Sequence, residues 1–173
     1  MINYKEHLHK ITTFIFDYDG VMTDGRVILL SNTEQLRTGN VKDGYALQLA
    51  IREGYRIAVF TGGKSRFIKS RCNELGILDV FLGVYDKLAT FNDYITENNI
   101  HPENILFMGD DIPDYEVMQR CGIAACPADA AEEIKKISHY ISTYKGGEGC
   151  VRDIIEQVMK IHGKWMNKNA FTW

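Results

Sequence analysis

The sequence predicts an α/β fold in which helices cover both faces of a central parallel sheet. Short runs of apolar, β-branched and aromatic residues recur along the chain, as expected for buried strands. The segments between these runs carry apolar residues at the three-to-four spacing of amphipathic helices. Strands and helices that alternate in this way build a parallel sheet.

The expected strands and helices can be placed in order along the chain. The strands are 13–16, 56–60, 80–83, 104–109, 122–126 and 139–142, and the helices are 43–53, 64–75, 87–98, 113–120, 130–136 and 151–162. Asp43 is the expected N-cap of the first helix, and Gly54 and Gly76 suit helix C-termini. A length of 173 residues is typical of one domain, so we expect a single Rossmann-like three-layer sandwich over 1–173.

Residues 26–41, "RVILLSNTEQLRTGNV", interrupt this alternation. A strand-like first half and a turn-like Ser31-Asn32-Thr33 predict a β-hairpin inserted after the first strand. The apolar stretch from Val27 to Leu30 would expose contiguous apolar surface and open strand edges, which favour association. We expect the hairpin to pair with another copy of the chain, and a hairpin folded back on its own domain is the alternative.

The two ends of the chain and its composition limit the classes of function. The tail, 163–173, carries both tryptophans and is expected either to dock on a neighbour or to fray. A net charge of −3 shows no basic excess, so we expect no nucleic-acid partner. The four cysteines lack zinc-site spacing and are expected to be reduced, buried thiols. Without a signal-like N-terminus or a long apolar run, we expect no membrane association and a cytoplasmic location.

Polar residues gather where several expected strands end or the next helix begins. They are Asp17 and Asp19; Thr61, Gly62, Gly63 and Lys64; Lys87; and Asp110, Asp111 and Asp114. In open parallel sheets ligands bind beyond the carboxyl ends of the strands, so we expect these residues to form one pocket. Several carboxylates at one point repel each other unless a cation lies between them, and oxygen ligands alone favour Mg²⁺.

The same set of residues suits phosphate chemistry. A glycine-rich turn with free N–H groups and a lysine can neutralise and orient a phosphate. Asp17 could then attack phosphorus as a nucleophile and form an aspartyl-phosphate intermediate. Asp19, two residues further on, could protonate the leaving oxygen and later activate water.

In these motifs the chain resembles the haloacid dehalogenase-like phosphohydrolase superfamily. "DYDGVMTD", "TGG", Lys87 and "GDDIPD" match its four motifs in order. The resemblance implies a haloacid dehalogenase-like fold in which Asp17 is the nucleophile, Asp19 the acid/base, and Thr61 and Lys87 bind the phosphoryl group. It also implies Mg²⁺ held by the Asp17 carboxylate, the Asp19 backbone carbonyl and Asp110, with Asp111 and Asp114 in support.

From about residue 11 to residue 166, the chain is most similar to the small capless enzymes of the 3-deoxy-D-manno-octulosonate 8-phosphate (KDO8P) phosphatase type. This resemblance implies hydrolysis of KDO8P in lipopolysaccharide precursor synthesis by a homotetramer whose hairpin closes a neighbour's site. The implied substrate-binding residues are Asp19, Asn40, Val41, Lys42, Asp43, Gly44, Thr61, Gly62, Lys64, Arg71 and Lys87. Gln48 and Gly63 stand where some members carry arginines, and Glu148 lies in a glycine-rich segment that can fold over the site.

Two alternatives stay open from the sequence. Related enzymes hydrolyse 9-phosphates of nine-carbon keto acids (KDN or N-acylneuraminate), so the sugar acid is not assigned by the motifs. A non-enzymatic receiver-like phosphoacceptor domain also combines aspartates, a threonine and a lysine around Mg²⁺. Receiver domains, however, place the phosphorylated aspartate on a later strand, whereas this chain carries its D-x-D-G on the first.

Overall fold

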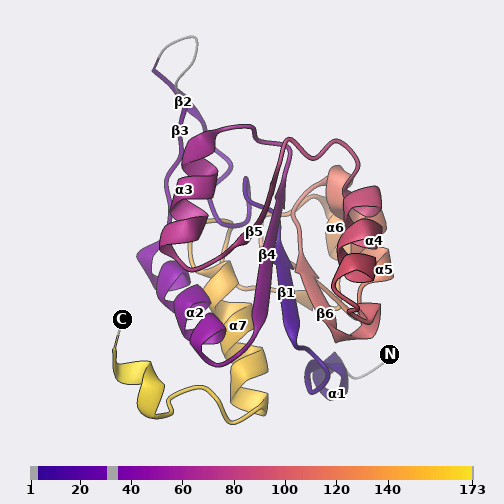
Figure 1. Ribbon diagram of the computed structural model, residues 1–173. Helices are drawn as coiled ribbons and strands as arrows, with labels where there is room; N and C mark the ends of the chain where they lie inside the picture. Colours follow the sequence, from indigo (N-terminus) through magenta and orange to yellow (C-terminus); the bar gives the residue numbers. More distant parts are fainter. Residues whose placement is uncertain (1–3, 31–34, 173) are drawn as a thin grey trace.

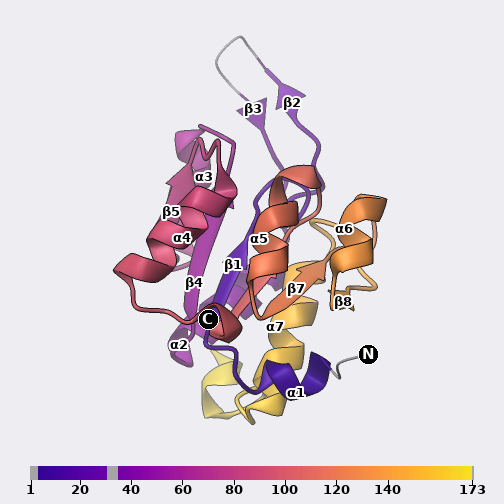
Figure 2. The same ribbon diagram turned by 90° about the vertical axis from the view of Figure 1, so that its right-hand side faces the viewer.

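The computed structural model describes residues 4–30 and 35–172 and has the expected three-layer α/β architecture (Figures 1 and 2). A six-stranded parallel sheet has the strand order β5-β4-β1-β6-β7-β8. Its strands are β1 (Thr13–Phe16), β4 (Arg56–Thr61), β5 (Asp79–Leu82), β6 (Ile105–Met108), β7 (Ile123–Cys126) and β8 (Tyr140–Ile141). β1 lies in the interior of the sheet, where Phe16 pairs with Val59 of β4 and Met108 of β6.

Helices cover both faces of the sheet because successive side chains of each strand point to opposite faces. Phe14 and Phe16 of β1 pack with α1 (Tyr4–Leu8), α2 (Val41–Arg52), α3 (Arg66–Glu74) and α7 (Cys150–Ile161). Ile15 packs on the other face with α4 (Lys87–Glu97), α5 (Tyr115–Arg120) and α6 (Glu132–Ile137). Figure 1 shows these two helical layers on either side of the sheet. None of the described helices is long and apolar enough to cross a membrane.

Helix boundaries agree with the expectations except at a few ends. Gly54 and Gly76 follow α2 and α3 with φ of +88° and +84°, which confirms their place at helix C-termini. Asp43 is not the N-cap of α2. Asn40 has that role because its side chain accepts the N–H groups of Lys42 and Asp43, so the helix begins earlier. The expected helix at 113–120 is preceded by a 3₁₀ turn, η2 (Ile112–Asp114), and α1 and η1 (Pro102–Asn104) were not expected.

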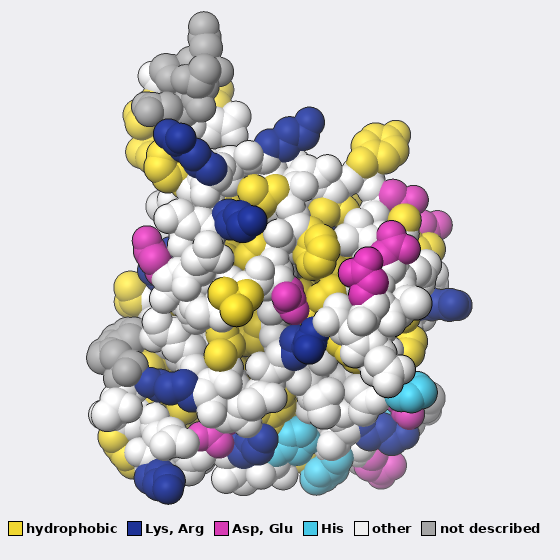
Figure 3. All heavy atoms as spheres, viewed as in Figure 1, with side chains coloured by type: hydrophobic (Ala, Val, Ile, Leu, Met, Phe, Trp, Pro, Cys, Tyr) yellow, Lys and Arg dark blue, Asp and Glu magenta, His cyan; other side chains and the backbone are white. Residues whose placement is uncertain are grey.

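The expected hairpin follows β1 and consists of β2 (Ile28–Leu29) and β3 (Gln35–Leu36), paired antiparallel. It projects from the body at the carboxyl end of the sheet (Figure 1). Its apolar side chains are exposed, with Leu29 at 71% (Figure 3). The expected turn at Ser31-Asn32-Thr33 lies outside the described residues.

The tail packs on its own chain, which neither sequence expectation foresaw. Its 3₁₀ turn, η3 (Lys168–Phe171), lies against α2, where the Tyr45 hydroxyl donates to the carbonyl of Ala170. Arg52 Nη2 donates to the Thr172 carbonyl at 2.9 Å. The guanidinium of Arg152 in α7 lies 5.2 Å from the ring centre of Trp165, a cation–π contact that joins the tail to a second helix. Fraying is therefore wrong for the described part of the tail, and docking on a neighbour stays a prediction.

Candidate active site

A cavity of about 570 Å³ opens beyond the carboxyl ends of β1, β4 and β6. We call it the acidic cavity. Of the residues selected from the sequence, it is lined by Asp17, Asp19, Thr61, Gly62, Gly63, Lys64, Lys87, Asp110, Asp111 and Asp114. These residues come from four separate stretches of the chain, and the parallel sheet brings them together because its strands all end at the same edge.

Lys87 is the buried cation of the acidic cavity. Asp86 caps α4 by accepting the Ala89 N–H at 2.8 Å, and this starts the helix at Lys87. The Lys87 ammonium lies 3.0 Å from Oδ1 of Asp17 and 2.5 Å from Oδ1 of Asp114. Burial alone would lower the pKa of Lys87, but the two carboxylates outweigh it and raise that pKa. The lysine therefore stays charged and holds two carboxylates in place.

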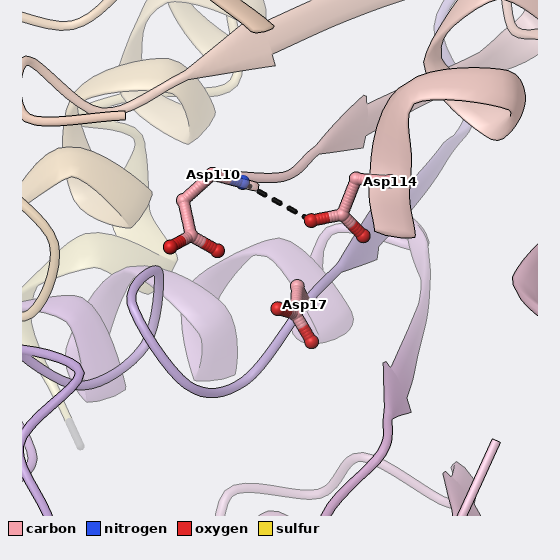
Figure 4. A group of neighbouring side chains, drawn as sticks. All are labelled: Asp17, Asp110 and Asp114. Atoms are coloured by element: carbon pink, nitrogen blue, oxygen red, sulfur yellow. Dashed lines mark hydrogen bonds between the residues drawn. The ribbon is translucent and has the colours of Figure 1, made fainter. Parts of the chain in front are cut away.

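Asp17, Asp110 and Asp114 converge on one point (Figure 4). One carboxylate oxygen from each lies within 4.8 Å of the others, and the Asp110 N–H donates to Asp114 Oδ2 at 3.1 Å. Burial, with Asp114 nearby, raises the pKa of Asp17 to about 7 although Lys87 opposes the shift. Burial, together with Asp17 and Asp114, raises the pKa of Asp110 to about 8. The Lys87 ammonium does not balance three carboxylates, two of them buried, and a divalent cation would.

Glycines allow the backbone to approach these carboxylates closely. Gly20 has a φ of +87°, and a Cβ there would lie 2.0 Å from Oδ2 of Asp110. Gly146, from the glycine-rich segment before α7, packs on the same loop, where a Cβ would lie 1.9 Å from the Gly20 carbonyl oxygen. The Gly147 N–H donates to the Val21 carbonyl at 3.0 Å. The loop after β1 is thus held in place by a segment far along the chain.

Asp19 and Thr61 line the same cavity. Thr61 is buried, and its hydroxyl oxygen accepts the Gly63 N–H at 3.0 Å. The Asp19 carboxylate accepts two hydrogen bonds from Arg37, one from Nε to Oδ1 at 2.6 Å and one from Nη2 to Oδ2 at 3.1 Å. Arg37 follows β3 directly, so a residue at the base of the hairpin reaches the site.

Sequence reasoning missed Arg37 and Thr23. The Thr23 hydroxyl is buried and accepts the N–H groups of Gly20 and Gly25 at 3.3 and 3.2 Å, which organises the loop after β1. A Thr two residues before a glycine is a weak turn signal that could have found it. No local motif marks Arg37, because its partner lies 18 residues earlier in the chain.

Several residues expected to bind the sugar do not line the acidic cavity. They are Asn40, Val41, Lys42, Asp43 and Gly44, which form the start of α2, and Arg71 of α3. The Asn40 side chain donates to the Gly147 carbonyl at 3.2 Å, and Asp43 accepts the Arg152 N–H at 2.7 Å. Arg71 lines a separate cavity of about 380 Å³ with Tyr18 and Arg37. Glu148 is exposed, and Asp111 caps η2 by accepting the Ile112 N–H.

Comparison with known proteins agrees with the geometry of the site. The family of haloacid dehalogenase-like hydrolases matches residues 68–154. The KDO8P phosphatases KdsC of Salmonella typhi and Escherichia coli K12 are each 34% identical over 155 residues, which cover 90% of this chain and 82% of theirs.

The chain belongs to the haloacid dehalogenase-like hydrolases. It is a haloacid dehalogenase-type phosphatase related to the KDO8P phosphatases, which sets aside the receiver-domain alternative. The crystal structure of the KDO8P phosphatase from Yersinia pestis matches with a TM-score of 0.90 at 31% identity, over 92% of this chain and 86% of that one. The enzyme from Moraxella catarrhalis, in complex with magnesium, phosphate and KDO, matches with a TM-score of 0.89 at 30% identity, over 93% of both chains.

Proposed function

We propose that this phosphatase is a Mg²⁺-dependent phosphomonoesterase that hydrolyses 3-deoxy-D-manno-octulosonate 8-phosphate to KDO and phosphate. The observation that carries the proposal is the buried contact of Asp17 with Lys87 beside Asp110. This contact brings together the proposed nucleophile Asp17, the proposed phosphate-binding cation Lys87 and the proposed metal ligand Asp110 at one edge of the sheet. The substrate is suggested by the relatives of the KDO8P phosphatase type, one of which holds KDO and phosphate.

The acidic cavity has donors that fit Mg²⁺. Its candidate ligands are oxygen atoms, and one carboxylate oxygen from each of Asp17, Asp110 and Asp114 lies within 4.8 Å of the others. We propose that Asp17, Asp110 and the Asp19 backbone carbonyl hold the ion, with Asp111 and Asp114 in support. When bound, Mg²⁺ would neutralise these carboxylates and polarise the phosphoryl oxygens.

The first half of the reaction is phosphoryl transfer to Asp17. Thr61, Gly62, Lys64 and Lys87 hold the phosphoryl oxygens, so that a carboxylate oxygen of Asp17 can attack phosphorus. The bond from phosphorus to the ester oxygen breaks, and that oxygen keeps the electron pair and takes a proton from the carboxyl group of Asp19. The sugar acid leaves as the free alcohol.

The second half is hydrolysis of the aspartyl phosphate. Asp19, now ionised, accepts a proton from a water molecule as the water oxygen attacks phosphorus. The bond between phosphorus and the Asp17 oxygen breaks, and this releases phosphate and restores both aspartates to their starting states. The cycle needs no other reactant than the phosphate ester and water.

The sugar acid requires cations beyond the phosphate site. A neighbouring cavity of about 680 Å³ shares Gly62, Gly63 and Lys64 with the acidic cavity and adds Arg37 and Arg66. We call it the basic cavity. The charges of Lys64 and Arg66 suit the substrate's carboxylate, since Arg37 is already paired with Asp19. The residues at the start of α2, from Asn40 to Gly44, and Arg71 complete the proposed sugar-binding set, as in the family pattern.

A nine-carbon keto acid 9-phosphate is the second candidate substrate. Gly63 lies in both the acidic and the basic cavity and carries no side chain between them. A Cβ at this position would lie 2.8 Å from Ile68 Cδ1, so a side chain here would displace the end of Ile68. The resulting space favours a longer substrate than an arginine at this position would admit.

We also propose that the hairpin pairs with a second copy and that the enzyme is a homotetramer. The exposed apolar side chains of the hairpin support this part of the proposal; they are Val27, Ile28, Leu29, Leu30 and Leu36. Contiguous apolar surface of this kind is stabilised when another chain covers it.

The test is a kcat/KM panel over eight-carbon and nine-carbon keto acid phosphates, with hexose phosphates as controls, measured with and without Mg²⁺. We expect the eight-carbon substrate to exceed hexose phosphates by about 100-fold or more. Equal rates on all substrates would leave a phosphatase without this specificity. Absence of Mg²⁺-dependent phosphate release from every ester would overturn the proposed function itself.

A further inference from the structure

The contact between Arg37 and Asp19 is the strongest feature of the site that the proposed reaction does not use. The guanidinium donates through Nε and Nη2 to the two carboxylate oxygens of Asp19, a bidentate fork. The side chain of Arg37 is only 11% exposed. The Asp19 side chain is 32% exposed, so the fork is partly buried, and its two parallel bonds fix the plane of the carboxylate better than a single surface ion pair does.

We propose that Arg37 is a positioning residue that holds Asp19 in the orientation needed to activate water in the second half-reaction. The proposal rests on the proposed function, because it assigns a role within that reaction. It concerns the hydrolysis step, because in that step an oxygen of Asp19 must be directed at the attacking water molecule.

The hydrogen bonds of Asp19 indicate which oxygen acts. Oδ1 takes the 2.6 Å bond from Arg37 and lies 3.5 Å from the Thr23 hydroxyl. Oδ2 takes the longer bond from Arg37, at 3.1 Å. Each carboxylate oxygen has two lone pairs, so Oδ2 keeps more accepting capacity than Oδ1.

Oδ2 is also the oxygen nearer to the phosphate-binding turn. A Cβ built on Gly63 would lie 3.6 Å from Asp19 Oδ2 and 3.2 Å from the hydroxyl oxygen of Thr61. Oδ2 and the Thr61 hydroxyl therefore face the same small space beside the glycine turn. A water molecule that attacks a phosphoryl group held by Thr61 would lie within reach of Oδ2, which we assign as the accepting atom.

Arg37 also connects this orientation to the hairpin. Arg37 follows β3 directly, so a movement of the hairpin strands would also move the backbone from which the Arg37 side chain reaches Asp19. A lysine would keep the charge but not the two parallel donors, so the fork and the charge can be separated by substitution.

The experiment measures the two half-reactions separately with p-nitrophenyl phosphate and Mg²⁺. Nitrophenol is a good leaving group, so phosphoryl transfer needs little help from an acid, and the initial burst of nitrophenol reports that step. The steady-state rate then reports hydrolysis of the intermediate. The variants are Arg37→Gln and Arg37→Lys. Arg120→Gln, in the last turn of α5, is the matched control, because Arg120 is exposed and lines neither the acidic nor the basic cavity.

We expect both Arg37 variants to keep a burst rate within about threefold of the wild type. Their steady-state rates should fall roughly 10- to 100-fold, as is usual when a catalytic group is displaced by about 1 Å. The burst should approach one nitrophenol per active site, because the aspartyl phosphate accumulates. Arg120→Gln should keep both rates, and circular dichroism melts should show that all variants fold.

Other outcomes overturn the inference. An equal fall in both rates would mean that Arg37 acts only on the structure of the site. A selective fall of the burst rate would place Arg37 in phosphoryl transfer, and wild-type rates in Arg37→Lys would mean that charge alone is needed. The proposed function fails separately, if the wild type itself releases no nitrophenol in a Mg²⁺-dependent way.

Discussion

The acidic cavity and the hairpin lie at the same end of the sheet, yet they are built in opposite ways (Figure 1). In the cavity, charged groups are buried and contact one another, as Lys87 does with Asp17 and Asp114. In the hairpin, apolar groups such as Leu29 are exposed. The cavity draws its stability from contacts within one chain, whereas the hairpin has apolar surface that only a partner would cover. Changes in the first should therefore affect chemistry, and changes in the second should affect association.

The largest effect is expected from Asp17→Asn in the acidic cavity. Loss of the proposed nucleophile should lower kcat at least about 1,000-fold while the chain stays folded, because an amide fills the same space. Phosphate release measures the loss of kcat, and a thermal melt checks that the variant is folded. Asp93→Asn, on the exposed side of α4, is the control and should keep its activity. Residual activity of a tenth or more would exclude Asp17 as the nucleophile.

The next effect concerns the close approach of Gly20 to Asp110. Gly20→Ala should reduce kcat/KM by roughly 100-fold and weaken Mg²⁺ binding, because the new Cβ would displace the Asp110 carboxylate. Gly54→Ala is the matched control, since Gly54 has nearly the same φ, +88°, but nothing within 4 Å of an added Cβ.

Gly54→Ala should cost only about 1 kcal/mol of stability, from the backbone conformation alone. Magnesium titration by calorimetry, together with denaturant unfolding, separates the two effects. Similar behaviour of the two variants would show that backbone strain, and not contact with Asp110, limits the loop after β1.

A smaller effect is expected at Asp43, which is buried but lies outside the acidic cavity. Burial raises the pKa of Asp43 from 3.8 to about 6, and its Oδ2 has no hydrogen-bond partner among the described residues. The folded state therefore binds the proton more tightly than the unfolded state does. Ionisation at Asp43 should lower stability as pH rises from about 4 to about 6, by on the order of 2 kcal/mol.

Asp43→Asn removes this titration but keeps an oxygen for the Arg152 N–H. Its melting temperature relative to the wild type should rise from pH 4 to pH 7 and then level off. Melts across that range check the slope, with Asp93→Asn as an exposed control. A constant difference at every pH would contradict the assigned origin of the shift.

The smallest effect on the chain itself is expected in the hairpin. Leu29→Asp should change the free energy of unfolding of an isolated chain by less than about 0.5 kcal/mol, because the side chain is already exposed. It should nevertheless dissociate the proposed assembly, which sedimentation measures. Leu78→Asp places the same change at another exposed leucine, 79% accessible, and should leave the assembly intact. Equal assembly of both variants would remove the hairpin from the interface.

Much of the fold could be predicted because buried strands leave a strong local pattern. "TFIF" and "RIAVF" are apolar along their length, and the structure has strands within a residue of both expectations. The N-cap of α2 could not be placed in this way. Asn40 and Asp43 are both suited to capping, and the choice depends on Asp43 being drawn toward the N-terminus of α7, more than a hundred residues away.

The site residues also fall into those that the sequence could predict and those that it could not. Asp17, Lys87 and Asp110 could be selected because each lies at a strand end or a helix start, positions that a parallel sheet brings together. Arg37 could not, because its contact with Asp19 depends on the path of the hairpin between them. The tail could not be placed either, since its partners on α2 and α7 become neighbours only when the helices pack.

The packing of Gly146 on the loop after β1 has a consequence for synthesis of the protein. The ribosome makes Asp17 before its strand neighbours, β4 and β6, and before the segment that closes its loop. A nascent chain that stops short of Gly146 has the nucleophile on a strand whose loop is still open. Phosphatase activity should therefore arise only after Gly146 has been made.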